Sequence, residues 1–150
     1  TLPPAYYEIE NDIIDLQCAD LNKDGWNDML VSVGYSPARF EIWINRGDLT
    51  FEDATADLAP NGSHDNWAWR LPVVDFNGDD WPDFFVSTID ENDRIYINQG
   101  GTGYTVLNPP DNMNNLMPID ANGDGRTDFY WAGATADDGT EYEPVFFRNQ

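Results

Sequence analysis

Three acidic nonapeptides constrain this chain more than any other feature of its sequence. They read DLNKDGWND from Asp20 to Asp28, DFNGDDWPD from Asp75 to Asp83 and DANGDGRTD from Asp120 to Asp128. Their starting points lie 55 residues (20 to 75) and 45 residues (75 to 120) apart. Self-similarity at such a period is typical of repeat architectures, so we expect several copies of one supersecondary unit.

The segments around the nonapeptides repeat as well, and they are typical of strands. A short strand-like run precedes each loop, an apolar run follows it, and a third run ends on Asn in every copy. In the first two copies a glycine-containing turn leads into a fourth run. All runs are too short for helices and rich in β-branched or aromatic residues.

We therefore predict an all-β chain of about three four-stranded antiparallel units, each the size of a β-propeller blade, with almost no helix. The approximate repeats cover 13–58, 67–108 and 115–150, and the third copy stops before its fourth strand. The chain forms a single repeat domain over 1–150.

Composition excludes several classes of function. The chain has 28 acidic and 7 basic residues and a formal charge of −21, which argues against binding nucleic acid or an anionic membrane surface. No apolar run is long enough to cross a bilayer, so membrane insertion is not expected. An aromatic content of 14% argues against disorder.

A single cysteine, Cys18, excludes an intrachain disulfide, and its strand-like surroundings favour a buried, inert thiol. Because the chain opens on Thr1 and not on Met, we expect a processed chain or an excised piece.

The nonapeptides are candidate calcium sites. Ca²⁺ selects oxygen ligands, about six to eight of them, and a tight loop offers side chains at positions 1, 3, 5 and 9 with a backbone carbonyl at position 7. The predicted ligand sets, with position 7 contributing its carbonyl, are Asp20, Asn22, Asp24, Trp26 and Asp28; Asp75, Asn77, Asp79, Trp81 and Asp83; and Asp120, Asn122, Asp124, Arg126 and Asp128.

Position 6 of each loop requires a left-handed backbone, which explains Gly25 and Gly125. The middle loop has Asp80 there, so we expect it to be the weakest of about three Ca²⁺ sites. The last acid stands at position 9 and strands flank the loop, which excludes an EF-hand. One His and one Cys make zinc a poor candidate. The alternative is an Asx-rich turn that binds nothing.

The pattern Asp-x-Asn-x-Asp-Gly-x-x-Asp, an apolar strand, and then Asn-x-Gly with an aromatic residue resembles the FG-GAP/VCBS-type repeat. The resemblance runs from about Ile13 to Gln150. It implies the blades of calcium-binding β-propellers, as in integrin α-subunits and several lectins, with calcium in the turn between the first and second strands. It also implies an extracellular, secreted or cell-surface setting.

Other features have simpler explanations. The tripeptide Arg46–Asp48 occupies the Asn-x-Gly turn of the repeat and is not expected to mediate cell attachment. His64 and the sequon at 61–63 lie in a polar insertion. Trp26 and Trp81 share one loop position and should pack between neighbouring units, whereas Trp43 and Trp131 should be core.

A candidate ligand groove with an aromatic floor lies opposite the calcium turns. It would comprise Trp67, Trp69, Arg70, Asp90, Asn92 and Asp93.

Three functions remain open. The favoured one is a non-catalytic, calcium-stabilised extracellular module that binds a glycan or a protein. The alternatives are a structural block of an extracellular oligomer or filament, and the propeller portion of a polysaccharide-degrading enzyme. No acid–base set is evident outside the loops, so we do not expect an enzyme. Since propellers use about four to eight blades, further blades or like subunits should complete the ring. The segment 5–10, AYYEIE, is a candidate outer strand for such a ring.

Overall fold

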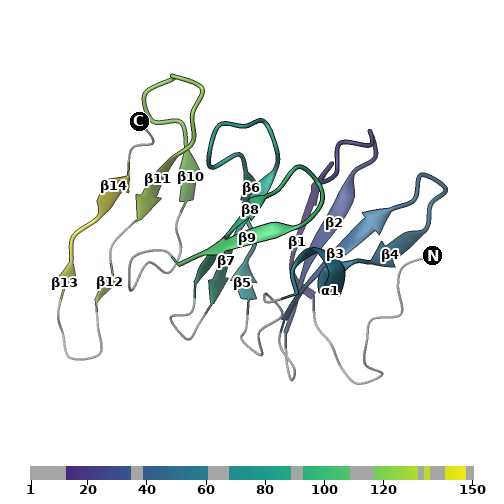
Figure 1. Ribbon diagram of the computed structural model, residues 1–150. Helices are drawn as coiled ribbons and strands as arrows, with labels where there is room; N and C mark the ends of the chain where they lie inside the picture. The colour runs from purple at the N-terminus through teal and green to yellow at the C-terminus, as the bar shows by residue number, and fades with distance from the viewer. Residues whose placement is uncertain are drawn as a thin grey trace.

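The computed structural model describes residues 13–34, 39–60, 68–88, 93–108, 117–131, 134–135 and 141–147. Within these ranges the chain is almost entirely β, as predicted, and its antiparallel sheets lie in a row (Figure 1). We refer to the three main sheets as units 1, 2 and 3 in chain order. No closed ring is formed by the part of the chain that is described.

Unit 1 is a four-stranded sheet in the order β1-β2-β3-β4. Its strands are β1 (Ile13–Ala19), β2 (Asp28–Val33), β3 (Arg39–Asn45) and β4 (Phe51–Asp53). The four-residue helix α1 (Thr55–Leu58) follows β4 and is the only helix among the described residues. The buried Thr55 ties it to the sheet, since its hydroxyl oxygen accepts a 2.8 Å hydrogen bond from the Ile42 amide.

Unit 2 repeats this meander with an interrupted first strand. Its strands are β5 (Ala68–Arg70), β6 (Val73–Val74), β7 (Asp83–Thr88), β8 (Arg94–Asn98) and β9 (Tyr104–Leu107). Both β5 and β6 pair with β7. Pro72 lies between them and has no amide to donate to the ladder, although its carbonyl still accepts a 3.0 Å bond from the Phe85 amide. The run that the sequence predicts as one strand is therefore split at this proline.

Unit 3 contains three paired strands, β10 (Met117–Ile119), β11 (Asp128–Trp131) and β14 (Val145–Phe147). Two short strands, β12 (Ala134–Thr135) and β13 (Glu141–Tyr142), form a hairpin between β11 and β14. No fourth strand pairs with β14 among the described residues, in agreement with the sequence alignment of the repeats.

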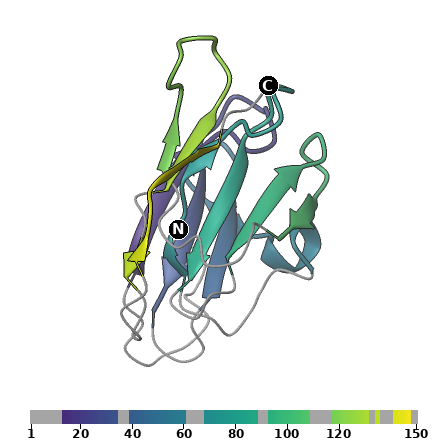
Figure 2. The ribbon, with the colours of Figure 1, turned by 90° about the vertical axis from the view of Figure 1, so that its left-hand side faces the viewer.

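Apolar side chains fill the space between neighbouring sheets. Seen from the side of unit 3, the strands of the three units overlap and run in similar directions (Figure 2). Between units 1 and 2, the rings of Phe40 and Phe84 meet edge to face with their centres 5.4 Å apart. Within unit 2, Phe84 in turn stacks on Tyr96 with the ring centres 4.5 Å apart. Between units 2 and 3, Phe76 stacks on Phe129 at 4.6 Å. This packing removes apolar side chains of neighbouring sheets from water, so the units stabilise one another.

Of two residues predicted to be buried, one is buried and the other is exposed. Trp43 is buried, as expected, and its indole nitrogen donates a 2.7 Å hydrogen bond to the buried Glu41. The prediction of a buried Cys18 is wrong: the thiol is exposed on β1, the first strand of the row, which has no sheet of another described unit on its far side. In the part of the chain that the structure describes, no helix is long and apolar enough to cross a membrane.

Candidate metal loops

The three acidic nonapeptides lie at the same end of the three sheets (Figure 1). Each connects the first strand of a unit to the second, as the strand pattern predicts: β1 to β2, β6 to β7, and β10 to β11. The repeat therefore brings three oxygen-rich turns to one edge of the molecule.

The loops fold by the same set of hydrogen bonds from backbone amides to their own carboxylates. In the first loop, Asp20 accepts bonds from the amides of Asp24 (3.0 Å) and Gly25 (2.8 Å), and Asp24 accepts one from the Trp26 amide (2.9 Å). The equivalent bonds recur in the second and third loops. In all three the Asn at position 3 donates from its side-chain amide to the Asp at position 5. These hydrogen bonds to the carboxylates fix the shape of each turn.

Two positions of each loop have a left-handed backbone. At position 6, Asp80 adopts a φ of 70°, which confirms that aspartate replaces glycine there with the same conformation. Position 4 is also left-handed, and there the first loop carries Lys23 (φ 58°) where the others carry glycine. The sequence pattern did not suggest this second requirement, because lysine is an unusual residue at positive φ.

The aspartate at position 9 has a different role from the others. Asp28 is buried, and its two oxygens accept bonds from the Leu21 amide (2.9 Å) and the Asn45 amide (2.8 Å). Asp83 repeats both bonds. Burial raises the pKa of both carboxyl groups, although the two backbone amides in each case act against that shift. Position 9 thus joins the start of the loop to the end of the third strand, a structural role that the spacing alone did not reveal.

The side-chain oxygens of the loops are the ligand type that a hard cation prefers, but their positions suit a bound cation only in part. Positions 1, 3 and 5 lie at the rim, exposed or half-buried, and each carboxylate oxygen that accepts one amide bond retains a second lone pair. The Oδ1 atoms of Asp75 and Asp120 already accept two amide bonds each. Position 9 lies beneath them with both oxygens engaged. Among the described residues, no three His, Cys, Asp or Glu side chains are gathered closely enough to form a metal cluster. A cation bound here would therefore need the position-9 carboxylate to share its oxygens or move.

The third loop carries an additional local interaction. Hydrogen bonds lower the pKa of Asp124 to about 2, the largest contribution coming from the Arg126 amide and smaller ones from the Asn122 and Arg126 side chains. The Arg126 guanidinium lies 3.2 Å from Asp124. In this loop a cationic side chain already lies beside the position-5 carboxylate.

Residues of unit 2 contact the first acidic loop directly. The buried Asn98 donates from its side-chain nitrogen to the Leu21 carbonyl (2.9 Å), and the Lys23 ammonium lies 4.3 Å from the centre of the Trp81 ring. A Cβ atom added to Gly101 would lie 3.2 Å from the Asn22 Cα, and Gly101 has a φ of 77°, so another residue there would be both crowded and strained. Trp81 therefore packs between units, as predicted, whereas the same prediction is wrong for Trp26, which is 53% exposed.

Only some residues of the predicted ligand groove lie in the part of the chain that the structure describes. Trp69 and Arg70 are exposed on β5, toward the end opposite the acidic loops (Figure 1). Trp67, Asp90 and Asn92 lie outside the described residues. Asp93 does not form part of a groove rim, because it is buried and its carboxylate accepts a 2.7 Å bond from the Thr88 amide. Burial raises the pKa of Asp93 to about 6.

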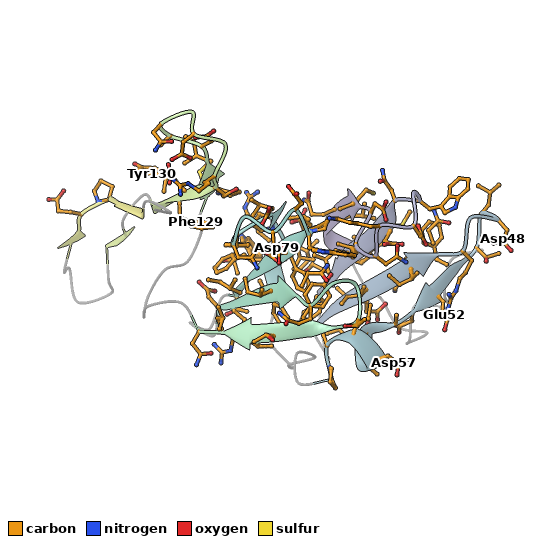
Figure 3. The ribbon with its side chains drawn as sticks, turned by 45° about the horizontal axis from the view of Figure 1, so that its top comes forward. Asp48, Glu52, Asp57, Asp79, Phe129 and Tyr130 are labelled. Carbon is orange, nitrogen blue, oxygen red and sulfur yellow. The ribbon has the colours of Figure 1, made fainter. Side chains whose placement is uncertain are left out.

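The Arg46–Asp48 tripeptide forms the turn between β3 and β4. Arg46 forms an ion pair with Glu52, and Asp48 accepts bonds from the amide and hydroxyl of Thr50, whose hydroxyl contributes most to lowering the pKa of Asp48. Asp48 and Glu52 are labelled in Figure 3. The turn is thus held by local bonds, as the repeat alignment suggests. His64 and the sequon lie outside the described residues.

The model of the FG-GAP-like repeat matches residues 20–86 and 75–131, two overlapping stretches that contain all three acidic loops. No curated protein matches the chain.

Proposed function

Because this chain belongs to the FG-GAP-like repeat family, we propose that it is a β-propeller-like module whose three acidic loops each hold one calcium ion. The observation that supports this most is the recurrence of one hydrogen-bond pattern in three loops at one end of the molecule. A turn that served only to reverse the chain would need far fewer acids than the three or four that each loop carries.

In this proposal the exposed oxygens of positions 1, 3 and 5 and the carbonyl of position 7 contact the ion from the rim. The position-9 carboxylate lies below and contributes through the lone pairs that its backbone amides leave free. Bound calcium would supply positive charge to a chain whose formal charge is −21. Since the unfolded chain has no such loops, binding would stabilise the folded state by mass action.

We further propose that the module acts outside the cell as a non-catalytic binding protein for a glycan or a protein partner. The FG-GAP-like repeats and the strongly acidic composition support this setting, and the exposed Trp69 beside Arg70 offers an apolar surface with a hydrogen-bond donor. A structural block of an extracellular oligomer is the second candidate, because apolar side chains are exposed at both ends of the row of sheets. The propeller portion of a polysaccharide-degrading enzyme is the third.

Calorimetric titration of the chelator-treated chain with Ca²⁺ tests the metal sites, and we expect about three ions per chain. Fewer than two would reject the assignment. A glycan array probed with the wild-type chain and with Trp69→Ala tests the ligand separately. Signals that Trp69→Ala does not weaken would exclude the β5 surface as the binding site.

A further inference from the structure

The third acidic loop differs from the other two at position 7, where Arg126 replaces a tryptophan. In the first two loops the ring at this position lies against the glycine turn of its own unit. A Cβ atom added to Gly47 would lie 2.8 Å from the Trp26 Nε1. One added to Gly101 would lie 3.2 Å from the Trp81 Cζ3. Neither indole carries a charge, whereas the guanidinium of Arg126 brings a permanent positive charge into the third loop.

The charge of Arg126 lies beside a carboxylate that is proposed to hold calcium. Its Nη2 atom donates a 3.2 Å hydrogen bond to the Oδ2 atom of Asp124, the acid at position 5. The same oxygen accepts a 2.8 Å bond from the Asn122 side chain. Because a carboxylate oxygen has two lone pairs, both lone pairs of this oxygen are engaged. Binding of a metal ion to Oδ2 therefore requires one of these donors to move away.

The position-5 acids of the other two loops keep more capacity for a cation. Among the described residues, the Oδ2 atoms of Asp24 and Asp79 accept one bond each, from the asparagine at position 3. The one basic residue of the first loop is Lys23, and its ammonium lies 4.3 Å from the centre of the Trp81 ring in unit 2. Both loops thus retain a lone pair on Oδ2 at position 5.

The number of charged residues also separates the loops. The second loop has four acids and no base, because it carries Asp80, whereas the first and third loops have three acids and one base each. Asp80 has a φ of 70°, in the same left-handed region as Gly25 at 92° and Gly125 at 81°. The extra carboxylate of the second loop therefore adds attraction for a cation and keeps the common backbone conformation.

On the basis of the proposed calcium binding, we infer that Arg126 competes with calcium for Asp124 and makes the third loop the weakest of the three sites. This order differs from the one expected from the sequence, which placed the weakest site in the loop with Asp80. The side chains of Arg126 and Asp124 are 50% and 28% exposed, so water screens their attraction. The expected reduction in calcium affinity is therefore moderate, about three- to tenfold.

Nuclear magnetic resonance can measure the three loops separately in one sample. The amides of Gly25, Asp80 and Gly125 each donate to the position-1 aspartate of their own loop, so their resonances report binding there. Chelator-treated wild type is titrated with Ca²⁺ in substoichiometric steps. We expect the Gly25 and Asp80 resonances to change first and the Gly125 resonance last. A Gly125 resonance that changes with or before the other two would overturn the inference.

Substitution of Arg126 tests the cause of the weaker binding. Arg126→Gln removes the charge but keeps a polar side chain, and it should tighten calcium binding at the third loop about three- to tenfold relative to the first two loops. Arg126→Lys keeps the charge and should leave the third loop the weakest. Arg46→Gln is the matched control, because Arg46 is 51% exposed, pairs with Glu52 outside the loops and makes the same change in net charge. It should leave the third loop unchanged.

Two further results would overturn the inference while leaving the proposed calcium sites intact. One is an Arg126→Gln variant whose third loop binds calcium no more tightly than that of wild type. The other is an equal tightening of the third loop in Arg46→Gln, which would mean that net charge alone sets the affinity. Resonances that do not respond to calcium in any of the three loops would instead reject the proposed metal sites, and this inference with them. Unchanged resonances of core residues verify that each variant is folded.

Discussion

At the scale of single residues, the buried aspartate at position 9 does more for the fold than the exposed acids around it. Asp28 joins two amides that are far apart in the sequence, those of Leu21 and Asn45, and both would be left unpaired inside the protein without it. Its spacing from Asp20 and Asp24 suggests a metal ligand first, but its burial indicates a structural function that persists without metal.

We therefore predict that Asp28→Ala lowers the free energy of unfolding by about 2–4 kcal/mol even in chelator, through the loss of two hydrogen bonds to a carboxylate. Asp24→Ala is the matched control, because its side chain lies at the exposed rim of the same loop, and it should cost less than about 1 kcal/mol in chelator. Urea unfolding of both variants measures this. Equal losses would contradict the distinct role assigned to position 9.

Asp93 makes stability depend on pH. Its pKa is raised by burial from the usual 3.8 to about 6 in the folded chain. As pH rises from about 4 to 6 the unfolded chain ionises first, so this residue makes the folded state progressively less stable. The loss is complete above the folded pKa and amounts to roughly 3 kcal/mol.

The variant Asp93→Asn should remove this contribution. We expect the difference in unfolding free energy between Asp93→Asn and wild type to shift in favour of the variant between pH 4 and pH 7. Urea unfolding at several pH values measures the shift, and a difference that stays constant with pH would contradict the raised pKa. Subtracting wild type also removes the contributions of Asp28 and Asp83, whose pKa values are raised too.

At the scale of loops and strands, the repeat predicts that the acidic turns act independently in binding. Asp24→Ala should remove one of about three calcium sites, because it deletes the position-5 ligand of one loop only. Asp48→Ala, another exposed aspartate but in the β3–β4 turn, should leave the number unchanged. Calorimetric titration counts the sites, and loss of all binding in Asp24→Ala would show that the loops are not separate sites.

Strand order and loop placement could be predicted from this sequence because three copies of one pattern align. The strand-like run IIDLQCA before the first loop and the run RFEIWIN that ends on Asn45 match β1 and β3 at both ends. What the pattern could not reveal depends on neighbours in space. Cys18 lies in a strand-like run like any core residue, and only the packing around β1 leaves its side chain exposed. Asp93 precedes β8 in a polar stretch, and only the fold buries it against Thr88.

At the scale of the whole molecule, comparing two equivalent asparagines separates the stabilisation that comes from the interface between units 1 and 2 from the stabilisation within one unit. Asn45 and Asn98 each bind the glycine turn and a loop carbonyl of their own unit, but only Asn98 also binds a carbonyl of another unit, that of Leu21. We expect Asn98→Ala to cost about 1–2 kcal/mol more than Asn45→Ala, since a buried inter-unit bond is lost in addition.

Thermal or urea unfolding of the two variants provides the comparison. A single cooperative transition in wild type that broadens or splits in Asn98→Ala would show that this bond couples the units, as expected for a repeat protein with nearest-neighbour interactions. Similar losses in both variants would mean that the inter-unit bond contributes little.

Leu16 and Leu71 are separated by the 55 residues that separate the first two acidic loops, and Val74 and Ile119 by the 45 that separate the second and third. These equivalent positions bear on how such a molecule can change over evolutionary time. Among the described residues, unit 2 packs one face on unit 1 and the other on unit 3. A tandem duplication or deletion of one whole unit in the gene would therefore join surfaces that already fit, with no new interface to be selected. A duplication beginning in the middle of a unit would not have this property unless its ends kept the same register. The boundaries at which the repeat tolerates recombination are thus set by the packing between sheets.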